Sequence, residues 1–262
     1  MSQNELTFTG ERLHPDDALF GIDLLRHRAA YREAIRFAHQ IGAQDVLELG
    51  SGTGYGTREL AAALPRVWAI DRVAPNAEAR GSAAQFIRAD LGAMPLRKQA
   101  FDLIVSFQVL EHLEDPSGYL DALAEHLRAD GCALLTTPNR ANSDGENPFH
   151  VHEYEAEELR RLLETRFEDV QMLGVSAKGD ARKYHTERLR RIRRIVRLDP
   201  LRLRERIPRR LVEWLFARLA RIVRRGIAAG DGMPAARLED FPIESAHADS
   251  IDLFAVCRHP RV

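Results

Sequence analysis

The segment VLELGSGTGYG, at residues 46–56, restricts the fold of this 262-residue chain more than any other stretch. Four glycines alternate at positions 50, 52, 54 and 56, directly after an apolar run typical of a buried strand. Because glycine has no Cβ, such a turn lets the backbone approach a ligand closely. The helix expected after it presents free N–H groups. The pattern predicts a strand, a ligand-binding turn and a helix, in that order.

An acidic residue, Asp71, ends the next apolar run, 21 positions after Gly50. A carboxylate at that distance accepts hydrogen bonds from both hydroxyls of a ribose, so we expect the ligand to contain a nucleoside. The dinucleotide pattern G-x-G-x-x-G would need a glycine where Tyr55 stands, which disfavours NAD. No Gly-Lys-Ser/Thr follows the turn, which excludes a P-loop.

Short apolar runs alternate with stretches of helical periodicity along most of the chain. This alternation predicts an α/β fold with a mostly parallel sheet and helices on both faces. Seven strands are expected, at 45–49, 67–71, 86–90, 101–106, 132–137, 167–175 and 251–257, with helices at 29–39, 57–64, 116–127 and 154–164.

The last two strands are separated by about 75 residues, and a structureless loop of that length is rare in a compact domain. We therefore predict that 178–250 forms a basic helical insertion or cap before the last strand. The sheet domain then comprises 41–177 and 251–262. Residues 1–40 form an N-terminal helical segment over the ligand site.

The composition excludes several classes of protein. With 38 Lys or Arg and 39 Asp or Glu, the formal net charge is −1, which disfavours a dedicated nucleic-acid binder. Two separated cysteines, Cys132 and Cys257, supply neither a disulfide framework nor a four-thiolate zinc site. No signal-peptide pattern and no run near the ~18 apolar residues of a membrane span is visible. We expect a cytoplasmic protein.

The near-zero charge is an average over two unlike parts. Between residues 178 and 225, 18 Lys or Arg stand against five Asp or Glu, a net charge of +13, which leaves −14 elsewhere. Three interpretations of this basic segment stay open. In the first, its apolar stripe packs on the sheet domain or on a second copy in a homodimer. In the second, it lies on an anionic membrane, at the inner face. In the third, which we rank last, it binds nucleic acid.

Five segments follow one another in a characteristic order: the glycine turn at 46–54, AID at 69–71, RADL at 88–91, FDLIVSFQVLEHLEDP at 101–116 and LLTTPNR at 134–140. Together they resemble the motifs of the class I S-adenosylmethionine-dependent methyltransferases. The resemblance implies a Rossmann-like fold with a seven-stranded sheet. It also implies an enzyme that uses S-adenosyl-L-methionine as methyl donor.

The resemblance also assigns positions around that cofactor. In the family, the glycine loop lies against the methionine part, and Asp90 would lie beside the adenine. Arg12 is expected to pair with the methionine carboxylate, because a guanidinium matches carboxylate geometry. The expected cofactor-binding residues are Arg12, Glu48, Gly50, Ser51, Gly52, Gly54, Asp71, Arg72, Asp90, Leu91 and Gln108.

Two more segments, FTGER at 8–12 and NPFHVHEY at 147–154, resemble bacterial methyltransferases associated with cell-surface glycans. The second segment also resembles quinone O-methyltransferases. His150 is our first candidate for a catalytic base, since it follows a bend after the fifth strand, at the sheet edge where ligands bind. The alternative is that His150 only holds its loop by hydrogen bonds. His112 is a second, weaker catalytic candidate.

In quinone O-methyltransferases, a stretch comparable to Glu111-His112 is associated with a divalent metal. Here Gln108 stands where a further carboxylate would help and no tight ligand spacing is present, so we expect no metal. Hydrogen bonding at a helix start is the role expected for Glu111 and His112. The leading function is O-methylation of a small-molecule, glycan or lipid-linked acceptor. The alternatives are an RNA methyltransferase and a non-catalytic nucleoside-binding scaffold.

Overall fold

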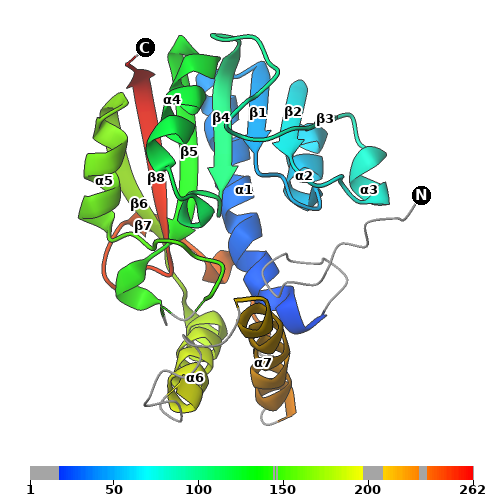
Figure 1. The fold of residues 1–262 in the computed structure, drawn as a ribbon, viewed down its shortest axis with the longest axis vertical. Coiled ribbons are helices and arrows are strands. Elements are labelled where there is room, and N and C mark those ends of the chain that lie inside the picture. Colours follow the sequence, from blue (N-terminus) through cyan, green and yellow to red (C-terminus); the bar gives the residue numbers. More distant parts are fainter. Residues whose placement is uncertain (1–17, 144, 146, 197–208, 230–234, 262) are drawn as a thin grey trace.

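The computed structural model describes residues 18–143, 145, 147–196, 209–229 and 235–261. Eight strands form one sheet in the order β3-β2-β1-β4-β5-β8-β6-β7 (Figure 1). The first five strands along the chain pair in parallel, whereas β8 and β7 run antiparallel to their neighbours. The strands are β1 Asp45–Leu49, β2 Arg66–Asp71, β3 Gln85–Arg88, β4 Phe101–Phe107, β5 Leu127–Pro138, β6 Phe167–Val175, β7 Ile243–Ser245 and β8 Asp252–Pro260.

The centre of the sheet places the glycine turn at a topological switch point. The chain runs from β1 outward through β2 and β3, then crosses to β4 on the other side of β1. Ligands of open α/β sheets bind in the crevice beyond the carboxyl ends of the strands at such a point. The α/β class that the alternating pattern predicts and the Rossmann-like fold that the family resemblance implies are both confirmed.

Two layers of helices cover the sheet (Figure 1). On one face, α1 Gly21–Ile41 and α2 Tyr55–Ala63 bury apolar side chains against β1 and β4. On the other face, α4 Pro116–His126 and α5 Ala156–Glu164 contribute to a second core cluster. A short helix, α3 Ala77–Arg80, precedes β3.

The start of α4 corrects one expectation about the site. The carboxylate of Asp115 caps this helix, accepting from the backbone N–H groups of Ser117 at 3.0 Å and Gly118 at 3.3 Å. Such caps satisfy the first N–H groups of a helix. Helix-start hydrogen bonding, which we expected from Glu111 and His112, is therefore the role of Asp115.

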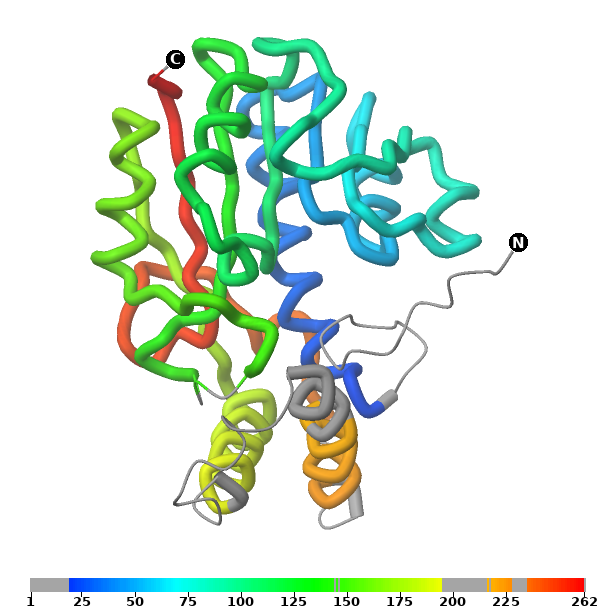
Figure 2. The backbone as a smooth tube through the Cα atoms, in the orientation of Figure 1, coloured from blue at the N-terminus to red at the C-terminus, as the bar shows by residue number. Residues whose placement is uncertain are grey.

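Two further helices, α6 Gly179–Val196 and α7 Arg209–Ala229, project beyond the carboxyl edge of the parallel strands (Figure 2). We call this pair the arm. Ile192 of α6 and Val223 and Ile227 of α7 are buried in a third core cluster, which also contains Ile22 of α1 and Val175 of β6. Part of the arm's apolar stripe therefore packs on the sheet domain.

A buried ion pair also fixes α7 to α1. The Arg224 guanidinium donates to the Asp23 carboxylate at 2.7 Å, and both side chains are less than 10% exposed. It also lies 4.2 Å from the centroid of the Phe20 ring. Burial alone would raise the pKa of Asp23, but the nearby guanidinium groups of Arg224, Arg188 and Arg26 outweigh it and hold that pKa well below its usual range.

The sheet differs from the expectation in one strand. Seven strands were predicted and eight are present, because β7 lies inside 178–250, where we expected helices alone. β7 is three residues long and pairs with the end of β6 at the sheet edge. So short a strand has no periodicity of its own, and only the partner strand determines it.

Replacement of Arg224 by alanine is expected to destabilise the folded protein. The substitution leaves the Asp23 carboxylate buried without its partner, which costs about 3–5 kcal/mol in comparable pairs. Chemical denaturation measures the free energy of unfolding directly. Arg225→Ala is the matched control, because Arg225 is the neighbouring exposed arginine, and we expect it to stay within about 0.5 kcal/mol of the parent. Equal losses in the two variants would contradict a structural ion pair.

Candidate active site

The glycines of the turn have different structural tasks. Gly50, Gly52 and Gly54 all have positive φ, at 78°, 55° and 84°, a region that favours glycine. A Cβ on Gly50 would lie 2.4 Å from a methyl of Val109, so this glycine allows β1 and the chain after β4 to approach. A Cβ on Gly52 would meet nothing within 4 Å. Gly52 is therefore the glycine whose surface is open to a ligand.

Gly54 and Gly56 serve packing instead. A Cβ on Gly54 would lie 2.7 Å from Cβ of Ala79, and a Cβ on Gly56 would lie 1.9 Å from the Tyr31 ring. The hydrogen bond from the Gly54 N–H to the Ser51 carbonyl, at 2.9 Å, closes the turn. The turn thus combines one open surface with three close contacts to its own protein.

Asp71 at the end of β2 supports the turn. Its two carboxylate oxygens accept from the backbone N–H of Gly52 at 2.7 Å and of Val73 at 2.8 Å. Each oxygen keeps a second lone pair, and the residue is partly exposed. Asp71 therefore holds the open glycine in place and retains acceptor capacity for the hydroxyls of a ribose.

Glu48 lies beneath the turn and is only 1% exposed. Its carboxylate accepts a hydrogen bond from Tyr31 of α1 at 2.5 Å and another from Thr57 of α2. Burial raises the pKa of Glu48 to about 7, against the effect of these two donors. Both oxygens are engaged within the protein, so Glu48 positions the turn. Tyr31 is itself buried in this arrangement.

Asp90, expected beside the adenine, lies after β3 in an exposed position. It pairs with the Arg72 guanidinium, with 2.9 Å from Nε to Oδ2, and accepts from the backbone N–H of Gly92 at 2.9 Å. The hydrogen bond from Gly92 and then the one from Arg72 lower the pKa of Asp90. Leu91 is half-buried against the core on the α4 and α5 face. Arg12 lies outside the described residues.

Gln108 follows β4 in a strained conformation. Its φ is 57°, which is uncommon for a residue with a Cβ. The backbone N–H donates to the Thr136 carbonyl at 2.9 Å, and the side-chain amide donates to the Thr136 hydroxyl at 3.3 Å. Such strain is concentrated at functional sites, where the surroundings hold it. Gln108 lies at the carboxyl edge of the central strands, as expected for a residue lining the pocket.

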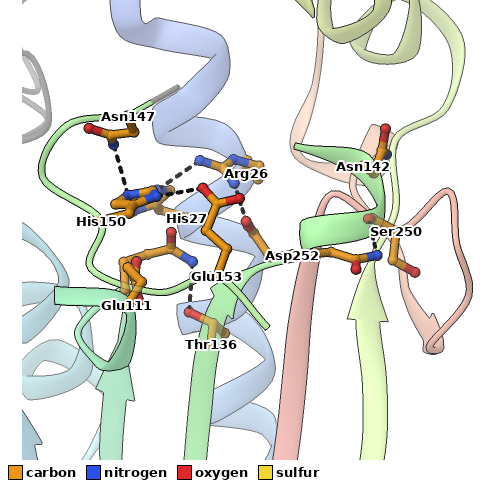
Figure 3. Close-up of polar contacts among 12 residues, drawn as sticks. Arg26, His27, Glu111, Thr136, Asn142, Asn147, His150, Glu153, Ser250 and Asp252 are labelled. Atoms are coloured by element: carbon orange, nitrogen blue, oxygen red, sulfur yellow. Dashed lines mark hydrogen bonds and ion pairs between the residues drawn. The ribbon is translucent and has the colours of Figure 1, made fainter. Parts of the chain in front are cut away.

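His150 is held by hydrogen bonds at both ring nitrogens (Figure 3). Nδ1 lies 2.6 Å from a carboxylate oxygen of Glu153, and Nε2 lies 2.8 Å from the Asn147 amide nitrogen. Burial would raise the pKa of Glu153, but the hydrogen bonds from His150 and Ser143 outweigh it and lower that pKa. An ionised Glu153 accepts the Nδ1 proton, so Nε2 carries the lone pair of the neutral ring.

Glu111 is fully buried next to this histidine. Neither of its carboxylate oxygens has a hydrogen-bond partner among the described residues, and the nearby Thr137 hydroxyl lies outside hydrogen-bonding geometry. Burial raises the pKa of Glu111 to about 7, while His150 opposes the shift. A buried carboxyl without a partner is costly and marks a site where something is bound or transferred.

Glu111, His112 and His150 converge. Each offers one ligand atom, and these atoms lie within 4.8 Å of one another. Nδ1 of His112 lies 3.0 Å from the Phe149 carbonyl, to which it donates, so Nε2 carries the lone pair in the neutral ring. The three residues have no tight ligand spacing in the sequence, yet they lie together in the fold. Glu111 and His150 are far apart in the sequence, but they follow neighbouring strands, β4 and β5. The fold therefore brings their side chains together.

Comparison with known proteins agrees with the fold and the turn. Residues 24–190 match the family described as methyltransferase domain. A Mycobacterium tuberculosis protein named probable S-adenosylmethionine-dependent methyltransferase is 36% identical over 194 residues, covering 71% of this chain and 67% of the relative. A ubiquinone biosynthesis O-methyltransferase of Rickettsia canadensis is 26% identical over 109 residues, covering 39% of this chain and 46% of its own.

A solved structure of a SAM-dependent methyltransferase from Thermotoga maritima has the same fold, with a TM-score of 0.56 at 14% identity, covering 90% of this chain and 91% of its own. The chain belongs to the class I S-adenosylmethionine-dependent methyltransferases. It is thus an enzyme that uses S-adenosylmethionine as methyl donor. The open surface at Gly52 and the acceptor oxygens of Asp71 fit that cofactor.

Replacement of Gly52 by alanine is expected to weaken cofactor binding at least 10-fold, because the new methyl occupies the open surface beside Asp71. Isothermal titration with S-adenosylhomocysteine measures the affinity. Gly42→Ala is the matched control: Gly42 also has positive φ, at 68°, and open space at its Cβ, but it ends α1 away from the turn. Both variants should lose about 1–2 kcal/mol of stability through backbone strain. Normal affinity in the Gly52 variant would place the cofactor elsewhere.

Replacement of Glu111 by glutamine is expected to stabilise the protein at high pH. A folded-state pKa raised from 4.5 to about 7 means that the native state binds the extra proton, so stability falls as pH rises through that window. At pH 8 the variant avoids ionising a buried carboxyl, a gain of roughly 3 kcal/mol. Thermal unfolding between pH 4 and 9, with EDTA present, shows whether the slope decreases.

The same unfolding measurement, repeated without EDTA, tests the expectation of no metal. Addition of Mg²⁺ or Mn²⁺ should leave the midpoint of thermal unfolding unchanged in both proteins. Stabilisation of the parent at pH 8, with none in the glutamine variant, would overturn that expectation and assign a cation to the three converging side chains.

Proposed function

We propose that this methyltransferase acts on a hydroxyl oxygen of a small-molecule, glycan or lipid-linked acceptor. The observation that carries the proposal is the hydrogen-bonded pair of His150 and Glu153 at the carboxyl edge of the sheet. A histidine oriented by a carboxylate is suited to accept a proton from a hydroxyl. The names of two relatives support an oxygen acceptor: the ubiquinone biosynthesis O-methyltransferase, and a malonyl-[acyl-carrier protein] O-methyltransferase of Porphyromonas gingivalis, 32% identical over 97 residues.

The sulfonium of S-adenosylmethionine supplies an activated methyl group. The protein then needs to align the acceptor, exclude water and remove one proton. In the proposed step, Nε2 of His150 takes the hydroxyl proton as the oxygen–carbon bond forms and the carbon–sulfur bond breaks. The acceptor hydroxyl takes the position of the Asn147 amide at Nε2. Glu153 stabilises the imidazolium that results, because it is an ionised partner at Nδ1.

The acceptor class is identified by a labelled-methyl assay. Purified protein and methyl-labelled S-adenosylmethionine are added to a lysate that is then separated into glycan, lipid, RNA and protein. We expect label in the glycan or lipid fraction, bound through oxygen and stable to conditions that cleave esters. Label in RNA alone would overturn the proposal in favour of an RNA methyltransferase.

With the labelled acceptor in hand, His150→Ala is expected to lower kcat by about 10²–10⁴-fold, the usual contribution of a general base. The affinity for S-adenosylhomocysteine should not change, since the glycine turn is untouched. His152→Ala is the matched control, because His152 lies two residues away but pairs with Glu158. Full turnover in the His150 variant would show that this histidine only holds its loop.

We also propose that the arm rests on an anionic membrane surface. On α7, Ile222 is 62% exposed, and the arginines at 218 and 225 on the same side are exposed as well. Arg193 and Arg194 of α6 are also exposed. A cationic helix face with an apolar residue at its centre is typical of interfacial binding. No helix among the described residues is long and apolar enough to span a bilayer.

Vesicle co-sedimentation tests the membrane proposal. We expect binding to vesicles with 30% phosphatidylserine at about 0.1 M salt, weakened by high salt because the attraction is screened, and none to pure phosphatidylcholine. Ile222→Asp combined with Arg225→Glu should abolish it. Tight, salt-dependent binding to RNA without binding to vesicles would overturn the proposal.

A further inference from the structure

One phenylalanine of the candidate active site lies between the arm and both histidines. The ring of Phe149 contacts the ring of Phe216 on α7, edge to face, with centroids 6.3 Å apart. The Phe149 carbonyl accepts the hydrogen bond from Nδ1 of His112 at 3.0 Å. Its backbone N–H donates to the side-chain oxygen of Asn147 at 3.1 Å.

The hydrogen bond from the Phe149 N–H to Asn147 links Phe149 to His150. The Asn147 side chain, whose oxygen the Phe149 N–H holds, presents its amide nitrogen 2.8 Å from Nε2 of His150. The same backbone thus orients the ring of His112 directly and the ring of His150 through one amide. A displacement of Phe149 changes the hydrogen bonding of both rings.

The part of this loop from Val151 on is anchored by backbone hydrogen bonds to the chain after β4. The backbone N–H groups of Val151 and His152 donate to the Glu111 carbonyl, at 2.7 and 3.2 Å. Glu111 and His112 belong to the short turn Leu110–His112 after β4. The part of the loop before Val151 has its packing contact with α7 instead. Phe149 is half-buried, so the Phe216 ring covers a surface that would otherwise face solvent.

The helix that carries Phe216 is fixed to the rest of the protein. Arg224 is two turns of helix beyond Phe216 and is bound to Asp23 of α1, while Ala220 and Val223 between them are buried. The position of the Phe216 ring is therefore set by α1 and the sheet domain, not by the loop it contacts.

We propose that Phe216 is a positioning residue of the acceptor site, which acts through Phe149 to fix the ring of His112 and, until the acceptor displaces the Asn147 amide, the ring of His150. Helix α7 of the arm then forms one side of that site. The geometric part concerns the protein alone, and only its consequence for turnover rests on the proposed function.

The tautomer of His112 reports this geometry without any acceptor. The Phe149 carbonyl keeps the proton on Nδ1 of His112, whereas a neutral histidine in water prefers it on Nε2. Long-range proton–nitrogen correlation spectra of the protein labelled in histidine distinguish the two forms. His112→Gln and His150→Gln assign the signals. The sample contains S-adenosylhomocysteine and EDTA at a pH where the rings are neutral.

We expect the parent to show the Nδ1–H form at His112, and Phe216→Ala to show a mixture of both tautomers. Phe216→Leu should restore most of the parent spectrum, because it refills the contact. Phe149→Ala, which keeps the backbone carbonyl but removes the other ring without refilling the contact, should resemble Phe216→Ala. It supplies the same answer if Phe216→Ala does not fold.

Leu219→Ala is the matched control. Leu219 packs against the third core cluster from the same helix. We expect Leu219→Ala to lower stability and to leave the contact between Phe149 and Phe216 in place. We expect its His112 spectrum to equal that of the parent. A parent spectrum in both Phe216→Ala and Phe149→Ala, or an altered one in Leu219→Ala, would overturn the proposal.

Turnover separates this proposal from the proposed function. With an identified acceptor, Phe216→Ala should lower kcat on the order of 10–100-fold, as small misplacements of catalytic groups do, with unchanged affinity for S-adenosylhomocysteine. If no oxygen acceptor exists, the proposed function fails, but the tautomer of His112 still decides whether Phe216 positions the ring.

Discussion

The site depends on one buried carboxylate, that of Glu48, and on the two hydroxyls that bind it. Tyr31 donates from α1 and Thr57 from α2, so the end of β1 and two helices meet at one point below the glycine turn. A buried carboxyl without donors would be costly. Gly56 is part of the same arrangement, since any side chain there would displace the Tyr31 ring. The shape of the turn therefore depends on the contacts of Glu48 with Tyr31 and Thr57 as well as on the glycines of the turn.

The fold was largely predictable because its signals are local. An apolar run followed by alternating glycines specifies a strand and a turn wherever it occurs, and Asp71 follows at the expected distance. What could not be predicted depends on partners far away in sequence. β7 exists only against the end of β6, and Glu111 meets His150 only because β4 and β5 are neighbours. The contact between Phe149 and Phe216 joins segments without a shared motif.

The structure shows that the basic residues of the arm do not all lie on its surface. A net charge of +13 between 178 and 225 suggests an exposed basic surface. The Arg224 guanidinium is instead buried on Asp23, and Arg188 of α6 also lowers the pKa of the same carboxyl. Part of the basic excess therefore holds the arm on the sheet domain. Among the described residues of the arm, Arg193, Arg194 and Arg225 are exposed, whereas Arg224 is not.

Glu111 and His150 can take part in proton transfer or bind a cation, but His150 cannot do both at once. As a base, His150 needs the lone pair of Nε2 for the acceptor proton, and an ionised Glu111 nearby would stabilise the imidazolium that forms. As ligands of a cation, the same lone pair and the same two unpartnered oxygens would be occupied by the metal. One nitrogen cannot serve both purposes at once. In the second case the cation itself would lower the pKa of a bound hydroxyl, and the proton would leave to another acceptor.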